Sequence, residues 1–286
     1  MKDEFGRFHP IVNLIFYVVV LGITMFQMQI GMVLISLLWA GLYYFWLKGK
    51  KGIRYFLLVC VIVIFSAVIN PLFSHKGSTL LFYMFTGNPV TLESIVYGIV
   101  AATIIGIVLL WFSTFNQVIN AEKLLAAIGK AMPHVALLIT MIMRFIPKYS
   151  KYQREVAQIN KCNEKSKSGK IKDGFRNFSI TTSWALETSI YTADSMKARG
   201  FGAKRRTSYS NYKMETRDWV LIWYILVLAA VVITGLATDR MYTYYYPYFV
   251  IKNNAIGYIC YNLLCMIPIL INIREEIRWH RLKSKI

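Results

Sequence analysis

Acidic residues and metal-binding motifs are scarce in this chain of 286 residues. It has 14 Asp and Glu against 33 Lys and Arg, a net charge of +19, and its four cysteines form no CxxC pair. Scattered cysteines and histidines argue against a disulfide-stabilised secreted fold and against a zinc site. The chain also lacks a Walker A loop, a GxGxxG fingerprint and an HExxH helix. We therefore predict no catalytic residue, no metal and no cofactor.

Apolar residues are abundant instead. The sequence is 56% hydrophobic and 16% charged, whereas soluble domains are about 45–50% apolar and about 25% charged. A helix that crosses a bilayer needs ~20 mostly apolar residues. Because residues 1–10 lead into the first apolar run without a small-residue cleavage site, we interpret that run as a retained span. The six predicted spans are residues 11–28, 30–47, 53–73, 92–115, 219–238 and 255–273.

Tyrosine and tryptophan residues gather near the ends of these spans. Aromatic side chains of this kind favour the boundary between hydrocarbon and water. The sequence therefore predicts an interfacial aromatic belt that includes Tyr43, Tyr44, Trp46, Trp111, Trp219 and Trp223.

The distribution of positive charge predicts which way the spans run. Basic residues cluster after the second span, in the tail after residue 273, and in residues 144–217, where 17 Lys and Arg face six Asp and Glu for a net charge of +11. By contrast, Lys76 is the only charged residue of the loop 73–91. Cytoplasmic loops carry the excess of Lys and Arg. We therefore expect six spans with both termini in the cytoplasm.

These assignments divide an all-α polytopic membrane protein into three regions. Residues 1–115 form a membrane region of four spans, residues 116–217 a large cytosolic insertion, and residues 218–286 a second membrane region of two spans with a basic tail. Residues 132–147 are apolar but only 16 in number, and a crossing there would put the following basic stretch on the wrong side. We therefore favour a helix at the interface, or buried in protein, over a seventh span.

The cytosolic insertion is predicted to contain long amphipathic helices. Residues 120–132 have apolar side chains at helical spacing, and the run 132–147 continues into a polar, mixed-charge segment after Pro147, which either kinks the helix or starts a new one. Residues 165–174 are predicted to form a charged turn, and a second long helix is expected over 175–199. Gly200 should end it in a left-handed C-cap.

The basic residues of the insertion have two simple explanations. A cation such as Arg199 at a helix C-terminus complements the helix dipole. The run 204–206 could bind anionic membrane lipid, at ~1 kcal/mol for each basic residue near the surface. Nucleic acid is not predicted as a partner, since the basic residues are spread along membrane-adjacent helices without a recognition fold.

Four segments resemble a known family, in the family's own order. They are FHPIVNLIFY (8–17), the loop and following span over 70–98, MRFIPKY (143–149), and SMKARGFGAKRRTSY (195–209). Together they are similar to the transmembrane T component of energy-coupling factor (ECF) transporters, a family that includes the cobalt-transport membrane subunit. The last segment resembles the second Ala-Arg-Gly signature of that family. The matches cover residues 8 to about 217.

The resemblance implies a location, the plasma membrane of a prokaryote, and a function. T components join two ABC-type ATPase subunits to a small substrate-binding membrane subunit, the S component, which takes up a vitamin or a metal ion. Two crossing coupling helices each end in an Ala-Arg-Gly-like motif that docks in one ATPase. By this match, Ala198, Arg199 and Gly200 form the second motif. Arginine suits such a role because its guanidinium stays charged and binds carboxylates through two hydrogen bonds.

This chain departs from the family pattern at the position of the first Ala-Arg-Gly motif. Residues 160–167 read NKCNEKSK, without Ala-Arg-Gly. Either Lys161 or Lys165 replaces the arginine, or this end docks differently. Because lysine is a point charge rather than a planar fork, the two ATPase contacts should be unequal.

Glu187 and Asp194 lie seven residues apart, on one face of the second predicted helix. They either form a solvated face, with Lys197 able to pair with Asp194, or contact basic groups of the ATPase. Both interpretations remain open for Glu187. For the whole chain, a self-sufficient carrier or channel is the alternative function, although the spans lack the central ionisable residues of an ion pathway. A membrane-embedded transferase or protease is disfavoured because the acids are too dispersed.

Overall fold

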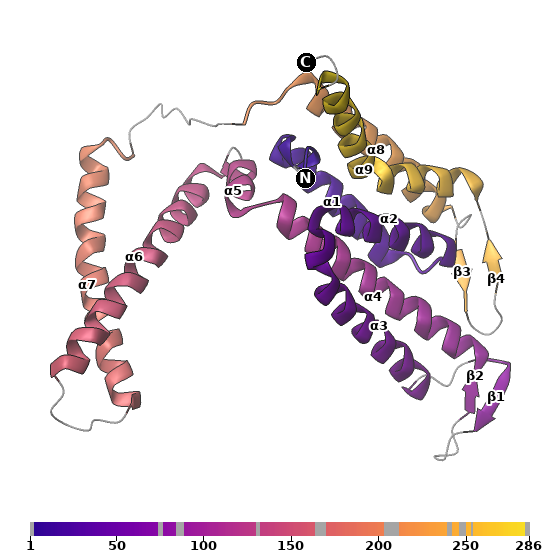
Figure 1. Ribbon diagram of the computed structural model, residues 1–286, viewed down its shortest axis with the longest axis horizontal. Coiled ribbons are helices and arrows are strands. Elements are labelled where there is room, and N and C mark those ends of the chain that lie inside the picture. The colour runs from indigo at the N-terminus through magenta and orange to yellow at the C-terminus, as the bar shows by residue number, and fades with distance from the viewer. Residues whose placement is uncertain are drawn as a thin grey trace. The chain divides into compact units, whose positions relative to one another are not determined.

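Helices dominate the computed structural model, as the sequence predicts (Figure 1). It describes residues 3–73, 77–83, 89–129, 132–163, 170–202, 212–238, 242–245, 250–252 and 254–283. The chain forms two compact units, one of residues 1–124 with 212–286 and one of residues 125–211. The predicted insertion 116–217 contains the whole second unit.

Six long helices form the first unit, which we call the bundle, and they lie where the sequence predicts the spans. They are α1 (Pro10–Phe26), α2 (Ile30–Lys48), α3 (Ile53–Phe73), α4 (Leu92–Val118), α8 (Thr216–Ala237) and α9 (Ala255–Lys283). A 3-10 turn, η1 (Phe5–Arg7), precedes α1, and another, η2 (Gly49–Gly52), joins α2 to α3. The helix α1 begins where the His9 ring accepts a hydrogen bond from Ile11 N–H and Pro10 occupies the first position.

Four stretches of the described residues are long and apolar enough to cross a membrane, which is consistent with a membrane protein. One of them, Ile30–Phe73, contains both α2 and α3, and α1 is apolar but shorter, at 17 residues. The other three are α4, α8 and α9. The helix that contains the apolar run 132–147 is not among these candidates.

Polar contacts show that consecutive helices of the bundle run in alternating directions. At one end, the Asn272 amide in the second half of α9 donates to Asp3, and Lys48 at the end of α2 donates to Ser113 near the end of α4. At the other end, Gln29 before α2 donates to the Lys252 carbonyl at 2.8 Å. Tyr245 donates to the carbonyl of Met28, and burial raises the pKa of this tyrosine to about 12.

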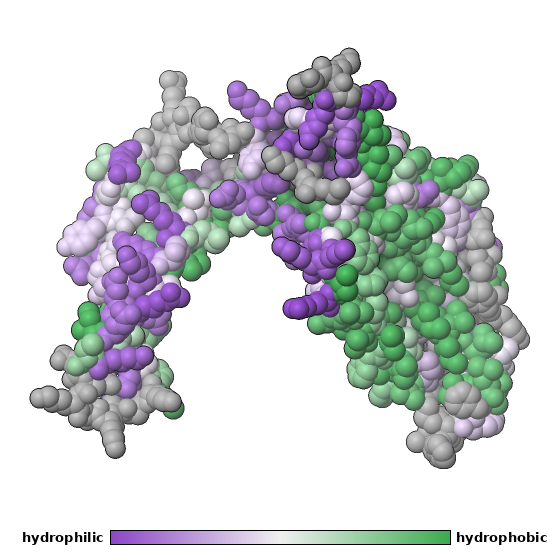
Figure 2. Space-filling view, viewed as in Figure 1, coloured by the Kyte–Doolittle hydropathy of each residue, from purple (hydrophilic) through white to green (hydrophobic). Residues whose placement is uncertain are grey.

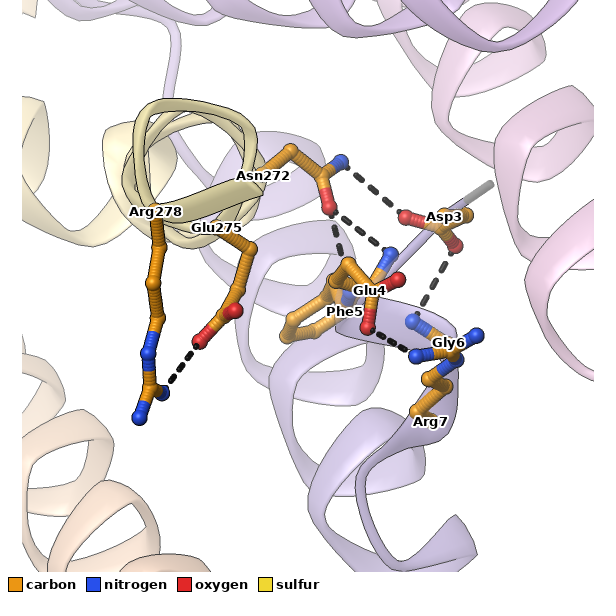
Figure 3. A network of polar contacts seen from close by, with 8 residues as sticks. All are labelled: Asp3, Glu4, Phe5, Gly6, Arg7, Asn272, Glu275 and Arg278. Carbon is orange, nitrogen blue, oxygen red and sulfur yellow. Dashed lines mark hydrogen bonds and ion pairs between the residues drawn. The ribbon is translucent and has the colours of Figure 1, made fainter. Parts of the chain in front are cut away.

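The N-terminal residues are fastened to α9 by a hydrogen-bond network (Figure 3). The Asn272 side-chain oxygen accepts hydrogen bonds from Glu4 N–H at 3.0 Å and Phe5 N–H at 3.1 Å, while its amide donates to Asp3 at 3.0 Å. Lys123 donates to the carbonyl of Gly6 at 2.8 Å. Burial lowers the pKa of Lys123, although the nearby Asp3 carboxylate opposes that shift. These contacts join the start of the chain to its last helix and to Lys123, at the start of the short helix that follows α4.

An aromatic cluster fills the bundle core, and it corrects the predicted aromatic belt. Tyr43, Tyr44 and Trp111 are fully buried, so they are core residues rather than residues of the interface. The Trp111 ring lies 5.8 Å from Phe16 and its indole N–H donates to Ser36 at 3.1 Å. The belt was predicted only because these residues lie close to the ends of the predicted spans. Their side chains instead pack against neighbouring helices, which a position along a span does not reveal. Trp219 and Trp223 do face outward, at 52% and 64% exposure.

Two short hairpins lie at the end of the bundle away from the termini, and the sequence did not predict them. Strand β1 (Leu80–Tyr83) pairs antiparallel with β2 (Pro89–Thr91), and β3 (Tyr242–Tyr244) pairs with β4 (Val250–Lys252). Strands of three or four residues are too short to give a clear alternating pattern in a sequence. They link α3 to α4 and α8 to α9.

The second unit contains two long helices, which we call the helical hairpin. A short helix, α5 (Ala121–Gly129), leads toward α6 (Pro133–Asn163), and α7 (Lys170–Ala198) follows. Helix α6 continues through Pro147, so that residue does not start a new segment. The predicted turn over 165–174 is wrong in its second half, because residues 170–174 already belong to α7. Charged residues and one glycine are compatible with a first helical turn.

Candidate functional site

The helices of the hairpin run antiparallel and meet along one seam. Half-buried side chains recur at intervals of three and four residues on both helices, which places them on one face of each. On α6 the seam residues are Met141, Phe145, Tyr149, Tyr152, Val156 and Asn160. On α7 they are Asp173, Asn177, Thr181, Trp184, Thr188, Thr192 and Met196. The two helices cross in Figure 1.

Trp184 is the main anchor of this seam. Its ring stacks on Tyr152 with centroids 3.9 Å apart and meets Tyr149 edge-on at 5.7 Å. The Lys148 ammonium lies 5.0 Å from the centroid of the same ring, within the range of a cation–π contact. Nearer the turn, the side chains of Asn160 and Asn177 are hydrogen-bonded. The aromatic contacts fix the register of α6 against α7.

The predicted signature Ala198-Arg199-Gly200 lies at the C-terminal end of α7. Gly200 has φ +79°, its N–H donates to the Lys197 carbonyl at 2.9 Å, and Phe201 N–H donates to the Met196 carbonyl at 2.9 Å. This pair of bonds is a Schellman cap, so the predicted role of Gly200 as a left-handed C-cap is confirmed. All three residues of the signature are exposed. Arg199 is therefore displayed on a rigidly terminated helix end.

Arg199 also lines a cleft of about 530 Å³ between the first half of α6 and the second half of α7. Two further cations of α6, Arg144 and Lys148, line the same cleft, and no acidic residue does so among the described residues. Within the residues that the structure describes, Arg144, Lys148 and Arg199 form no ion pair. Four residues of α7 add hydroxyl groups, and three further residues are apolar. The hydroxyl groups are those of Thr188, Tyr191, Thr192 and Ser195, and the apolar residues are Met141, Phe145 and Met196. We call this the cationic cleft.

The other predicted contact residues are not brought to this cleft. Lys161 is exposed near the end of α6, at the opposite end of the hairpin, and Lys165 lies outside the described residues. Glu187 is exposed on α7, and neither it nor Asp194 forms an ion pair within the described residues. The predicted pair between Asp194 and Lys197 is therefore absent, since a spacing of three residues permits such a contact without requiring it.

Arg144, Lys148 and Trp184 are the residues that sequence reasoning missed at this site. Arg144 and Lys148 are four residues apart, a spacing that places them on one face of a helix, and this signal could have been found. The pairing of that face with Arg199 depends on the register of α6 against α7, and Arg144 and Arg199 are 55 positions apart in the sequence. Trp184 sits in an otherwise small and polar stretch, and that contrast was a second signal.

The chain matches no protein-family model, and no curated protein matches it. The resemblance to ECF T components therefore rests on the residues of the four segments alone. In the structure they occupy the start of α1, the end of α3 with the start of α4, the middle of α6, and the end of α7. Residues 203–209 of the last segment lie outside the described residues.

Proposed function

We propose that this chain is the transmembrane coupling subunit, or T component, of an ECF-type ABC transporter. It joins two ATPase subunits to a small substrate-binding membrane subunit and has no catalytic residues of its own. The observation that carries the proposal is the ordered set of four family-like segments, of which the last contains Arg199, exposed at a capped helix end. The substrate would be a vitamin or a metal ion, bound by the partner rather than by this chain.

Six spans with both termini in the cytoplasm are part of the proposal. The alternating directions of the six bundle helices support it, because they bring the two termini to one end of the bundle. Figure 2 shows a broad hydrophobic surface on the bundle, with hydrophilic residues concentrated toward that end. The end is rich in Lys and Arg, as cytoplasmic loops are. These residues include Lys48, Lys50, Lys51, Arg54, Lys123, Arg217, Arg274, Arg278 and Lys283.

In this proposal the hairpin is the cytosolic coupling element. Arg199 pairs with a carboxylate of one ATPase, and Gly200 lets the two backbones approach closely. The other end of the hairpin, with Lys161 and Lys165, contacts the second ATPase without an arginine fork. Glu187 is an additional contact residue on the exposed side of α7.

One flank of the hairpin offers a surface for a membrane partner. Apolar side chains of both helices are exposed on the same side of the seam, and we call this the apolar flank. Exposed apolar patches of this kind mark protein–protein or membrane contacts. The small substrate-binding subunit and membrane lipid are the proposed occupants. The residues are Val135, Leu138, Ile142, Ile146, Ile171, Phe175, Phe178 and Leu186.

A self-sufficient carrier or channel is the alternative, and the buried charges argue against it. Within the described bundle, the two buried carboxylates are Glu93 and Asp218, both in the first turn of a helix. Glu93 accepts hydrogen bonds from Thr79 and Ser78, and Asp218 accepts one from Glu215 N–H in a capping box. Acids in such positions serve local structure, whereas an ion pathway needs ionisable groups near the middle of the bilayer.

Purification from the native membrane in mild detergent tests the proposal. The tagged chain should bring down two ABC-type ATPases and one small membrane protein, each identified by mass spectrometry. Alone, the chain should hydrolyse no ATP, since ATP hydrolysis belongs to the partners. Recovery of the chain without ATPases, or measurable ATP turnover by the chain itself, would refute the assignment. Substrate transport by the purified chain alone in liposomes would favour a carrier.

A further inference from the structure

The cationic cleft contains more positive charge than a single arginine contact requires. Arg144, Lys148 and Arg199 line it together, and the described part of the chain supplies no acid to neutralise them. The C-terminal end of α7 contributes a partial negative charge of roughly half an elementary charge, which offsets only part of the three. A cleft lined by charges of one sign favours binding of the opposite charge. The lining is therefore suited to an anionic partner.

The chemistry of the lining indicates how that anion is bound. The guanidinium groups of Arg144 and Arg199 can each bind a carboxylate through two parallel hydrogen bonds. The Lys148 ammonium is held over the Trp184 ring, 5.0 Å from its centroid, so it is pre-positioned at the edge of the cleft. A volume of about 530 Å³ is large enough for more than one acidic side chain.

The arrangement of the hairpin favours a protein segment over a phospholipid. At 100° per residue, Arg144 and Lys148 lie on one side of the α6 seam, while Ile142 and Ile146 of the apolar flank lie on the other. A phospholipid with its phosphate in the cleft could not lay its acyl chains along the apolar flank of the same hairpin. The apolar side chains next to the charges are instead those of the cleft lining, Met141, Phe145, Tyr191 and Met196, which can pack against the side chains of a protein segment that carries the carboxylates.

We infer that the cationic cleft is the docking site for an acidic segment of one ATPase, which presents at least two carboxylates, and that Arg144 and Lys148 are specificity-determining residues beside Arg199. This inference rests on the proposed function. The signature Ala198-Arg199-Gly200 by itself would confine the ATPase contact to the end of α7. The inference extends that contact to the first half of α6. The two proposed ATPase contacts then differ in charge as well as in sequence. The contact at Arg199 includes three cations of one cleft, whereas Lys161, at the other end of the hairpin, does not line that cleft.

The test compares two double variants in the purified transporter complex. Arg144→Gln with Lys148→Gln removes two cleft charges, and Lys151→Gln with Arg154→Gln removes two exposed charges of the same helix outside the cleft. The cleft variant should lose at least tenfold in ATPase affinity, measured by the amount retained across a dilution series, and its binding should depend less on salt. The control variant should change affinity less than twofold. Lys148→Arg, which keeps the charge, should retain binding.

The outcomes separate the two proposals. If wild-type protein retains no ATPase, the proposed function fails and the cleft inference falls with it. If Arg199→Glu releases an ATPase but the cleft variant does not, only the cleft inference is overturned. Equal losses in the cleft and control variants, at unchanged helicity and elution volume, would also overturn it. Loss of a bound phospholipid with full ATPase retention, seen by native mass spectrometry, would assign the cleft to lipid instead.

Discussion

The bundle and the hairpin bury their apolar residues in different ways. The bundle has a continuous core of aromatic and aliphatic side chains from all six helices. In the described part of the hairpin, Val156 is the single hydrophobic side chain classed as buried, and large apolar residues stand exposed on both helices. One unit is thus stabilised by its own packing, whereas the other presents its apolar and charged faces outward. The difference indicates that substitutions in the bundle should change stability and those in the hairpin should change partner binding.

The largest expected effect is on the bundle core. Trp111→Ala removes a fully buried ring that contacts Phe16, Tyr17 and Tyr43. The cavity should cost ~3–5 kcal/mol of unfolding free energy, seen as a lower Tm in detergent. Trp219→Ala, at a residue 52% exposed, is the matched control and should shift Tm little. Equal shifts would show that the bundle core is not where its stability lies.

A charge reversal in the hairpin should have the second-largest effect, on uptake rather than on stability. Arg199→Glu puts an anion where a partner carboxylate is expected, so substrate uptake by cells should fall more than tenfold, equivalent to at least ~1.4 kcal/mol of coupling free energy. Membrane insertion and Tm should be unchanged, because Arg199 is exposed. Lys197→Glu, two residues earlier and outside the cleft lining, should reduce uptake far less. Normal uptake by the Arg199 variant would contradict the coupling role.

The anchor of the hairpin seam should have a smaller and local effect. Trp184→Ala removes the stacking on Tyr152 and the contact with Lys148. The loss should be ~1–2 kcal/mol of local stability. Hydrogen exchange should speed up in α6 and α7 and stay unchanged in the bundle. If bundle amides exchange faster as well, the two units do not open independently.

The smallest expected effect is at the helix cap. Gly200→Ala forces a residue with a Cβ into φ +79°, at a cost of about 1 kcal/mol. Amide exchange should increase in the last turn of α7. Gly174→Ala offers a control of opposite sign, because it lies inside α7 with open space around its Cα and alanine favours helix. The same response from both variants would argue against the left-handed cap.

Much of the fold could be predicted because it is local. Runs of about 20 apolar residues located all six bundle helices, and Gly200 marked the end of α7. The predicted belt was wrong for Tyr43, Tyr44 and Trp111, since a sequence gives the depth of a residue along a span but not the side that faces a neighbour. Arg144 and Lys148 were missed for the same reason. Their meeting with Arg199 depends on the antiparallel register that Trp184 fixes, and one sequence does not reveal such a register.

Pro147 has a mechanical consequence for the hairpin. Proline removes one backbone hydrogen bond from the interior of a helix, so α6 is most easily bent near this residue. Pro147 lies between two cleft-lining residues, Arg144 and Phe145, and the Tyr152 ring that stacks on Trp184. A load applied at Arg144 would therefore bend the first half of α6 while its second half stayed packed against α7. The hairpin would therefore flex at Pro147, next to the residues that receive the load. Replacing Pro147 with a residue that has a backbone N–H would make α6 stiffer there.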